Sequence, residues 1–258
     1  MPAPHNPLKA ALALDTPLFG LWLSLGSGYA AEIAAATGFD WLLIDGEHGP
    51  NTLATIHEQL MALSGHNVSP VVRLPNNDPT LIKQVLDLGA QSLLCPMVNS
   101  ADEARAIVQA TRFPPKGIRG VGYILGRASN FNNIPDYLET SENEICLIVQ
   151  AESVAAMNAL EEICSVDGID GVFIGPADLC ADMGHLSDVA HPEVRVAVED
   201  GLRRIRATGK AAGIIDGDPK LIQQDLDAGA NFVGLGADVL LLVNAMRDLA
   251  KTWKARTT

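Results

Sequence analysis

The chain has 258 residues, of which 18 are Lys or Arg and 31 are Asp or Glu, so its formal net charge is −13. This acidic balance argues against nucleic acid or an anionic membrane as a partner, because both bind basic protein surfaces. Hydrophobic residues form 48% of the sequence, which is enough for a sizeable core. The N-terminus lacks an apolar run behind a basic flank, and no stretch approaches the ~20 apolar residues of a transmembrane helix, so we expect a cytoplasmic protein.

Short apolar runs alternate with helical segments along the whole chain. In chain order, strands are expected at residues 18–23, 39–44, 71–73, 92–95, 145–149, 172–174, 211–215 and 232–235. Helices are expected at residues 30–37, 52–63, 79–88 and 101–111, behind the fifth strand to residue 164, and then at 192–207, 219–228 and from 238 onward. Eight strands that alternate with helices in a chain of this length predict a (β/α)8 barrel, the TIM-barrel fold, with residues 1–258 as a single domain.

An internal repeat supports this architecture. Residues 78–90 recur as residues 218–230, and each copy begins with Asp-Pro and ends with Gly-Ala. An Asp N-cap, a Pro at the first helical position and a Gly after the last turn are typical boundaries of a helix. The alternative fold, a doubly wound open sheet, is disfavoured because no glycine-rich dinucleotide fingerprint follows the first strand.

Polar residues collect where four of the predicted strands end. In a (β/α)8 barrel the C-terminal ends of the strands lie on one rim, and this rim carries the active site. The candidate residues on it are Asp45, Glu47 and His48 after the second strand, Arg73 at the end of the third, Gln150 and Glu152 after the fifth, and Gly175, Pro176, Ala177 and Asp178 after the sixth.

Two carboxylates at adjacent strand ends predict a metal site. Glu152 and Asp178 offer oxygen ligands, which suit a hard divalent cation whose other positions are left to water and substrate. Residues 175–177 break the sixth strand and leave backbone amides exposed to a bound anion. The alternative role for Asp178 is to cap the helix that follows, since Asp is a favoured N-cap residue.

Acid–base and charge chemistry is expected from three other side chains on the rim. His48 shares its turn with Asp45, which predicts an imidazole that Asp45 orients for proton transfer. The alternative is a histidine that the backbone of a tight turn satisfies. Arg73 ends an apolar strand, and its planar fork of donors matches a carboxylate or an enolate oxygen.

Two segments carry more apolar surface than a monomer needs. Residues 113–133 are too long for an ordinary connection in a compact domain, and the terminal helix over residues 239–249 is apolar over much of its circumference. Such surface usually marks an interface, so we expect a homo-oligomer in which a neighbour completes the active site. The alternative is that residues 113–133 fold back over their own barrel mouth as a lid.

Five sequence motifs carry a resemblance to a known family. FDWLLIDGEHGPN (39–51), VVRL (71–74), GIRGVG (117–122), VQAE (149–152) and GVFIGPADL (171–179) resemble the HpcH/HpaI aldolase family. The likeness is to its 4-hydroxy-2-oxoheptanedioate aldolase branch, which consists of metal-dependent pyruvate aldolases. It implies reversible aldol cleavage of 4-hydroxy-2-oxo acids to pyruvate and an aldehyde.

The resemblance also implies roles for individual residues. Glu152 and Asp178 match the ligands of a Mg²⁺, Mn²⁺ or Co²⁺ ion, and His48 and Asp45 match the acid–base pair. Arg73 matches the residue beside the enolate oxygen. The pyruvate-binding positions of the family match Gln150 and the amides of Gly175, Pro176 and Ala177. The family further implies a hexamer built as a trimer of dimers, with the last helix packed on a partner.

Other functions stay open at this point. A CoA-thioester lyase of the citrate-lyase β-subunit type would use the same barrel, although CoA phosphates favour basic surface that this chain scarcely offers. A non-catalytic oligomer that binds oxo acids would use the same pocket without turnover. A Schiff-base lysine is disfavoured, because none of the lysines falls at the C-terminal end of a predicted strand. The run Leu74-Pro75-Asn76-Asn77 lacks the aromatic residue common in close relatives, so the acceptor aldehyde stays unspecified.

Overall fold

Eight parallel strands close into a barrel in the computed structural model of the chain, which describes residues 1–255. Each strand is hydrogen-bonded to the next, and the eighth returns to the first. The strands are β1 (Leu18–Leu23), β2 (Trp41–Asp45), β3 (Ser69–Arg73), β4 (Ser92–Cys95), β5 (Cys146–Ala151), β6 (Gly171–Ile174), β7 (Ala211–Ile215) and β8 (Phe232–Ala237). The predicted (β/α)8 fold is confirmed, and each strand lies within two residues of its expected ends.

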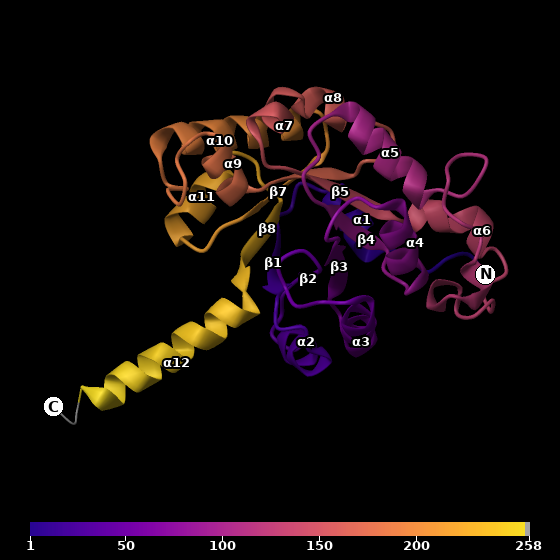
Figure 1. Cartoon of the computed structure of the whole chain (residues 1–258), viewed down its shortest axis with the longest axis horizontal. Coiled ribbons are helices and arrows are strands. Elements are labelled where there is room, and N and C mark those ends of the chain that lie inside the picture. Colours follow the sequence, from indigo (N-terminus) through magenta and orange to yellow (C-terminus); the bar gives the residue numbers. More distant parts are fainter. Residues whose placement is uncertain (256–258) are drawn as a thin grey trace.

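Helices surround the barrel between the strands (Figure 1). They are α2 (Gly28–Ala35), α3 (Leu53–Leu63), α4 (Pro79–Asp87), α5 (Ala101–Thr111), α7 (Val154–Asn158), α8 (Leu160–Cys164), α9 (Pro176–Asp182), α10 (Pro192–Ala207), α11 (Pro219–Asp227) and α12 (Asp238–Lys254). The helix expected behind β5 is divided into α7 and α8. Within residues 1–255, no helix has both the length and the apolar character that crossing a membrane requires.

The repeated segments form α4 and α11 with matching ends. The carboxylate of Asp78 accepts from the N–H of Thr80 at 2.6 Å, and that of Asp218 accepts from the N–H of Lys220 at 2.8 Å. Gly89 and Gly229, which follow the two helices, have φ values of +98° and +103°. Only glycine adopts this conformation without strain, so the same signals end both helices and turn the chain into the next strand.

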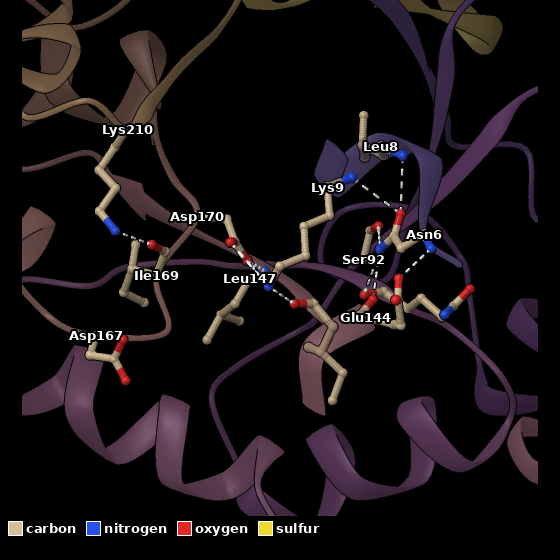
Figure 2. A network of polar contacts seen from close by, with 12 residues as sticks. Asn6, Leu8, Lys9, Ser92, Glu144, Leu147, Asp167, Ile169, Asp170 and Lys210 are labelled. Atoms are coloured by element: carbon tan, nitrogen blue, oxygen red, sulfur yellow. Dashed lines mark hydrogen bonds and ion pairs between the residues drawn. The ribbon is translucent and has the colours of Figure 1, made fainter. Parts of the chain in front are cut away.

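A short helix that the sequence patterns did not reveal closes one end of the barrel. This helix is α1 (Pro7–Leu12), and its Leu8 and Leu12 pack into the barrel interior. Its Lys9 Nζ donates to the carbonyl of Ile145 at 2.6 Å and lies 3.1 Å from the carboxylate of Asp170 (Figure 2). Ile145 and Asp170 directly precede β5 and β6, so α1 covers the N-terminal ends of the strands. The opposite rim is left for a site.

Aromatic side chains fill the interior between this base and the rim. The rings of Trp41 and Phe232 stack with centroids 4.0 Å apart, and those of Trp22 and Phe173 lie 5.4 Å apart. A Cβ atom on Gly20 would come within 2.0 Å of the Trp41 ring, so β1 needs glycine there. The barrel is therefore a packed core rather than a pore, and only its rim can bind a substrate.

The long connection between α5 and β5 lies on the N-terminal side of the barrel. It contains η1 (Tyr123–Leu125), η2 (Arg127–Ser129), α6 (Tyr137–Thr140) and η3 (Ser141–Glu144). The buried Arg119 guanidinium donates to Asp87 at the C-terminal end of α4 at 2.8 Å, and Arg127 Nη1 donates to the carbonyl of Leu88. Because barrel helices run antiparallel to the strands, these contacts hold the segment away from the rim. It is therefore not a lid over its own barrel mouth.

The terminal helix α12 projects away from the barrel (Figure 1). The carboxylate of Asp238 at its start accepts from the N–H of Ser24 at 2.8 Å, which ties the first turn to the end of β1. None of the residues Asp238–Lys254 is buried. The exposed apolar side chains of the helix are Val239, Leu240, Leu241, Leu242, Met246, Leu249 and Trp253.

Candidate active site

The candidate residues lie on one rim because the strands that carry them are in register. Asp45 ends β2 and Arg73 ends β3, and the two residues are direct partners in the sheet. On the far side, Ala151 of β5 pairs with Ile174 of β6, so Glu152 and Gly175 follow at the same level. The rim predicted from the strand ends is therefore present.

Arg73 is buried and held by two carboxylates. Its Nε and Nη2 donate to Oδ1 and Oδ2 of Asp45, each at 2.9 Å, and its Nη1 lies 2.8 Å from Oε2 of Glu47. Burial alone would raise the pKa of Asp45, but the hydrogen bond and charge of Arg73 and two backbone N–H groups lower it overall. A guanidinium has five N–H donors, so one N–H on Nη1 and one on Nη2 stay available to a substrate.

Asp45 contacts His48 through the backbone and not through the ring. Its Oδ1 accepts from the main-chain N–H groups of Glu47 at 3.1 Å and His48 at 3.2 Å, while its second oxygen binds Arg73. The expected orientation of the His48 imidazole by Asp45 is therefore not what the structure has. The His48 side chain is 69% exposed, and the carboxylate nearest its Nε2 is that of Glu47, at 3.9 Å.

Glu47 is a site residue to which sequence reasoning gave no role. Burial raises its pKa, and the charges of Asp45 and Asp178 add to this effect, while Arg73 and His48 oppose it. Its position between Asp45 and His48 in one turn is the signal that was present in the sequence. The turn places the carboxylates of Asp45 and Glu47 against Arg73, and the His48 ring lies beside Glu47.

Glu152 is a buried carboxylate in an acidic environment. Its Oε1 accepts from the N–H of Met97 at 2.7 Å, and its Oε2 accepts from Nε2 of Gln150 at 2.5 Å. Burial raises the pKa of Glu152 to about 7, and the negative charges of Asp178 and Glu47 contribute to the increase. An anion in such a place is stabilised by a bound cation.

Asp178 does not cap the helix it belongs to. The N-cap of α9 is Gly175, and Asp178 is an exposed residue of the first turn. Its charge acts on both Glu152 and Glu47, so its carboxylate faces the site. The metal-ligand interpretation of Asp178 is therefore compatible with the structure, whereas the capping role is not.

The surroundings of Glu152 are closely packed and leave an unused acceptor for a bound group. A Cβ atom on Gly175 would lie 2.4 Å from Oε2 of Glu152 and 2.9 Å from Nε2 of Gln150, so only glycine fits there. Oε1 of Gln150 is buried and has no hydrogen-bond partner within residues 1–255. Carboxylate and amide oxygens are the ligands of hard divalent cations, so the residues present fit such an ion.

The three residues after β6 differ in what they offer a substrate. The N–H of Gly175 donates to the carbonyl of Ala151 at 3.1 Å, and Pro176 has no N–H. Ala177 lies in the first turn of α9, where backbone N–H groups have no acceptor within the helix. Of the amides expected to bind an anion, the one at Ala177 is therefore available, and Gly175 lets the side chains of Glu152 and Gln150 pack against the backbone.

A second group of potential ligands lies in the connection before α10. His185 Nε2 is 2.9 Å from Oε2 of Glu193, and Nδ1 of His191 accepts from the N–H of Glu193 at 3.3 Å as the cap of α10. The two imidazole rings stack with centroids 3.6 Å apart and planes 17° apart. Lone pairs in two nearly parallel planes do not converge on one ion, so these contacts stabilise the turn.

The barrel and its carboxylate-rich rim define a (β/α)8 protein with the site of an enzyme, and comparisons with known proteins agree. The model of the HpcH/HpaI aldolase/citrate lyase family matches residues 18–245. The chain is 52% identical over 254 residues to a hydroxypyruvate/pyruvate aldolase of Roseovarius nubinhibens, covering 98% of this chain and 99% of that protein. It is equally identical to a 4-hydroxy-2-oxo-heptane-1,7-dioate aldolase of Escherichia coli, with 98% and 97% coverage.

Solved structures give the same result. The crystal structure of a HpcH/HpaI aldolase/citrate lyase family protein from Burkholderia cenocepacia matches with a TM-score of 0.93 and 41% identity over 96% of this chain and 99% of that one. The chain belongs to the HpcH/HpaI aldolase/citrate lyase family. Its resemblance to this family is thereby confirmed, and carbon–carbon lyase activity of the aldolase type is the function that this membership supports.

Proposed function

We propose that the protein is a divalent-metal-dependent pyruvate aldolase, which reversibly cleaves 4-hydroxy-2-oxo acids to pyruvate and an aldehyde. Two relatives named above are aldolases of pyruvate and of a 4-hydroxy-2-oxo acid. One observation carries the proposal. The rim combines a buried carboxylate, Glu152, whose pKa is raised to about 7, with the guanidinium of Arg73, which Asp45 holds in place. Cleavage needs positive charge at the site where the pyruvate enolate develops, and this rim provides it.

Glu152 and Asp178 would hold a Mg²⁺, Mn²⁺ or Co²⁺ ion. When bound, such an ion supplies Lewis-acid stabilisation of negative charge on the 2-oxo oxygen. The N–H of Ala177 would donate to the substrate's carboxylate, whereas the unpaired Oε1 of Gln150 is an acceptor and would receive a hydrogen bond from a hydroxyl group of the substrate or from a bound water. The absence of a side chain at Gly175 lets the Glu152 and Gln150 side chains lie against the backbone there.

Arg73 would stabilise the enolate oxygen with the N–H groups that Asp45 and Glu47 leave free. One preorganised donor at an oxyanion site contributes ~3–4 kcal/mol of transition-state stabilisation. The bidentate contact with Asp45 fixes the plane of the guanidinium before the substrate arrives. Preorganisation of this kind avoids reorganisation during the reaction.

His48 would transfer the proton of the C4 hydroxyl group. The His48 side chain is 69% exposed on the rim, so it would be accessible to the aldehyde part of the substrate. In cleavage the imidazole accepts the hydroxyl proton, and in condensation it returns a proton to the alkoxide. The carboxylate of Glu47 lies 3.9 Å from Nε2 of the ring.

The protein would act as a cytoplasmic homo-oligomer, with a hexamer built as a trimer of dimers as the proposed assembly. The exposed apolar side chains of α12 support this, because they need covering by another surface. We propose that α12 packs on a partner subunit. The segment of residues 113–144 lies at the N-terminal side of its own barrel, so any rim that it completes belongs to a neighbour.

Pyruvate release tests the activity. Metal-supplemented protein is incubated with a 4-hydroxy-2-oxo acid, and pyruvate is measured with lactate dehydrogenase. We expect turnover by the wild type and its loss in Glu152→Ala. The matched control is Glu162→Ala on the exposed face of α8, which should retain full turnover. An active Glu152→Ala protein would contradict the proposal.

A further inference from the structure

We infer that Asn77 is a positioning residue for Glu152 and that it acts through the peptide bond between Pro96 and Met97. The inference rests on the proposed role of Glu152 as a metal ligand. It adds a residue in the connection between β3 and α4, whose side chain determines the direction of one N–H group that binds Glu152.

The peptide between Pro96 and Met97 is held from both sides. Nδ2 of Asn77 donates to the carbonyl oxygen of Pro96 at 2.7 Å. The N–H of the same peptide, on Met97, donates to Oε1 of Glu152 at 2.7 Å. Hydrogen bonds at the two ends of one peptide group polarise each other, so each bond strengthens the other.

Met97 adopts a backbone conformation that its side chain disfavours. Its φ is +54°, in the left-handed region that residues with a Cβ atom rarely occupy. Such strain persists only where surrounding contacts over-determine it, and it is concentrated at functional sites. The contacts here are the bond from Asn77 to Pro96 and a bond from Nδ2 of Asn99 to the carbonyl of Met97 at 3.2 Å.

The strained conformation is the one that serves Glu152. A flip of the peptide between Pro96 and Met97 would move the φ of Met97 into the extended region and relieve the strain. The same flip would turn the N–H away from Glu152 and present a carbonyl oxygen to its carboxylate. Asn77 binds the carbonyl of Pro96 only in the unflipped state. It therefore selects the orientation that Glu152 needs.

Loss of this contact would affect the binding of a cation more than the fold. Oε1 of Glu152 accepts from Met97 and Oε2 accepts from Gln150, so the two donors fix the carboxylate in one orientation. Residues that orient a metal ligand typically contribute ~10–100-fold to metal affinity. We expect Asn77 to contribute within this range.

The test is calorimetric titration of metal-stripped protein with Mn²⁺ in the absence of substrate. Asn77→Asp keeps the size of the side chain but replaces the donor with an acceptor, and it should weaken Mn²⁺ binding ~10–100-fold. The matched control is Asn76→Asp, which adds the same charge at the adjacent exposed position. Oδ1 of Asn76 accepts from the N–H of Asp78, a role that a carboxylate retains, so this variant should bind within about twofold of wild type.

A rescue separates positioning from a structural effect. In Asn77→Ala the strained state loses its support, and affinity should fall as in Asn77→Asp. Adding Met97→Gly should restore most of the affinity, because glycine adopts a positive φ without strain and keeps the N–H. Loss of affinity in Asn77→Ala without recovery in the double variant would contradict the inference.

The outcomes also separate this inference from the proposed function. Glu152→Gln should lose Mn²⁺ binding; if it binds as tightly as wild type, the metal site and the role of Asn77 are both wrong. If Glu152→Gln loses binding but folded Asn77→Asp binds within twofold of wild type, only the inference about Asn77 fails. Where Asn77→Asp does not fold, Asn77→Ala is judged by the same criterion.

Discussion

At the scale of single residues, the rim of the barrel is organised around two opposite charges, the guanidinium of Arg73 and the carboxylate of Glu152. Arg73 is fixed by Asp45 and Glu47, whereas Glu152 is fixed by neutral donors and lies near other anions. The charge of Arg73 is therefore already balanced by carboxylates, whereas the carboxylate of Glu152 favours a bound cation. This asymmetry distinguishes the side of the site that we propose to bind the enolate from the side that we propose to bind the metal ion.

Replacement of His48 tests its role in proton transfer. We expect His48→Ala to lower kcat for aldol cleavage by ~10²–10⁴-fold, with little change in pyruvate affinity, because the proposed role of the ring is to transfer the proton of the C4 hydroxyl group. Steady-state cleavage kinetics and pyruvate titration measure the two effects. His5→Ala is the matched control, since the His5 side chain is 68% exposed and lies at the opposite end of the barrel. A His48→Ala enzyme that cleaves at the wild-type rate would show that the base is elsewhere.

The raised pKa of Glu152 predicts how stability depends on pH. Its pKa is about 7 in the folded protein against the ordinary value of 4.5, so folding favours the protonated form. The contribution to the free energy of unfolding is complete below pH 4.5 and decreases as pH rises through about 7. Glu152→Gln removes this titration and keeps the Oε1 acceptor. The free energy of unfolding of the metal-free wild type, measured relative to that variant, should therefore fall by about 2 kcal/mol between about pH 5.5 and about pH 8.5.

Urea denaturation of both proteins in EDTA at the two pH values measures this difference. A gap in the free energy of unfolding that does not change with pH would mean that Glu152 ionises as readily in the folded protein as in the unfolded chain.

The positions of the site residues could be predicted from the sequence more easily than their contacts. Arg73 and Glu152 lie at the rim as expected, because a strand end can be read from an apolar run followed by a polar residue. The contact between Asp45 and Arg73 could not be predicted from the sequence, because it depends on how β2 and β3 pair in the sheet. For the same reason the strained turn at Met97 left no signal in the sequence.

At the scale of elements, the strands and most helices follow from local patterns. The repeat that became α4 and α11 carries its own caps, so its ends were predictable. The helix α1 could not be predicted, because it has only six residues. Its two leucines are buried by contacts with the barrel interior, which a local sequence pattern does not reveal. The division into α7 and α8 likewise has no strong sequence signal.

The apolar face of α12 predicts an effect of charge on assembly. Leu242 and Met246 are four residues apart and lie on one face of the helix, and both are exposed. We expect Leu242→Glu/Met246→Glu to dissociate the proposed oligomer, because burial of two carboxylates in an interface is unfavourable. Light scattering measures the mass. Lys251→Glu is the control, because Lys251 is exposed on the opposite side of α12 beside the charged residues Arg247 and Asp248, and it should leave the assembly intact.

Wild-type protein gives the complementary result. A fully active, monodisperse monomer of 27.3 kDa would contradict both the interface on α12 and the proposed oligomer.

At the scale of the whole molecule, the two ends of the barrel have different tasks. The N-terminal end is closed by α1 and bordered by the segment of residues 113–144, where Lys9 and Lys210 bind backbone carbonyls (Figure 2). The C-terminal end carries carboxylates, an arginine and an exposed histidine. Two lysines that could otherwise form a Schiff base are thus held at the end of the barrel opposite the rim.

The central claim is that the rim uses a divalent ion to stabilise the enolate of pyruvate, and exchange of the pyruvate methyl protons tests it most directly. Proton NMR in D₂O follows the methyl signal of pyruvate without any aldehyde, so the result does not depend on the unknown acceptor. We expect rapid exchange with Mg²⁺-, Mn²⁺- or Co²⁺-loaded protein, no exchange after EDTA treatment, and recovery when the ion is restored. Exchange at the full rate in exhaustively EDTA-treated protein would contradict the account.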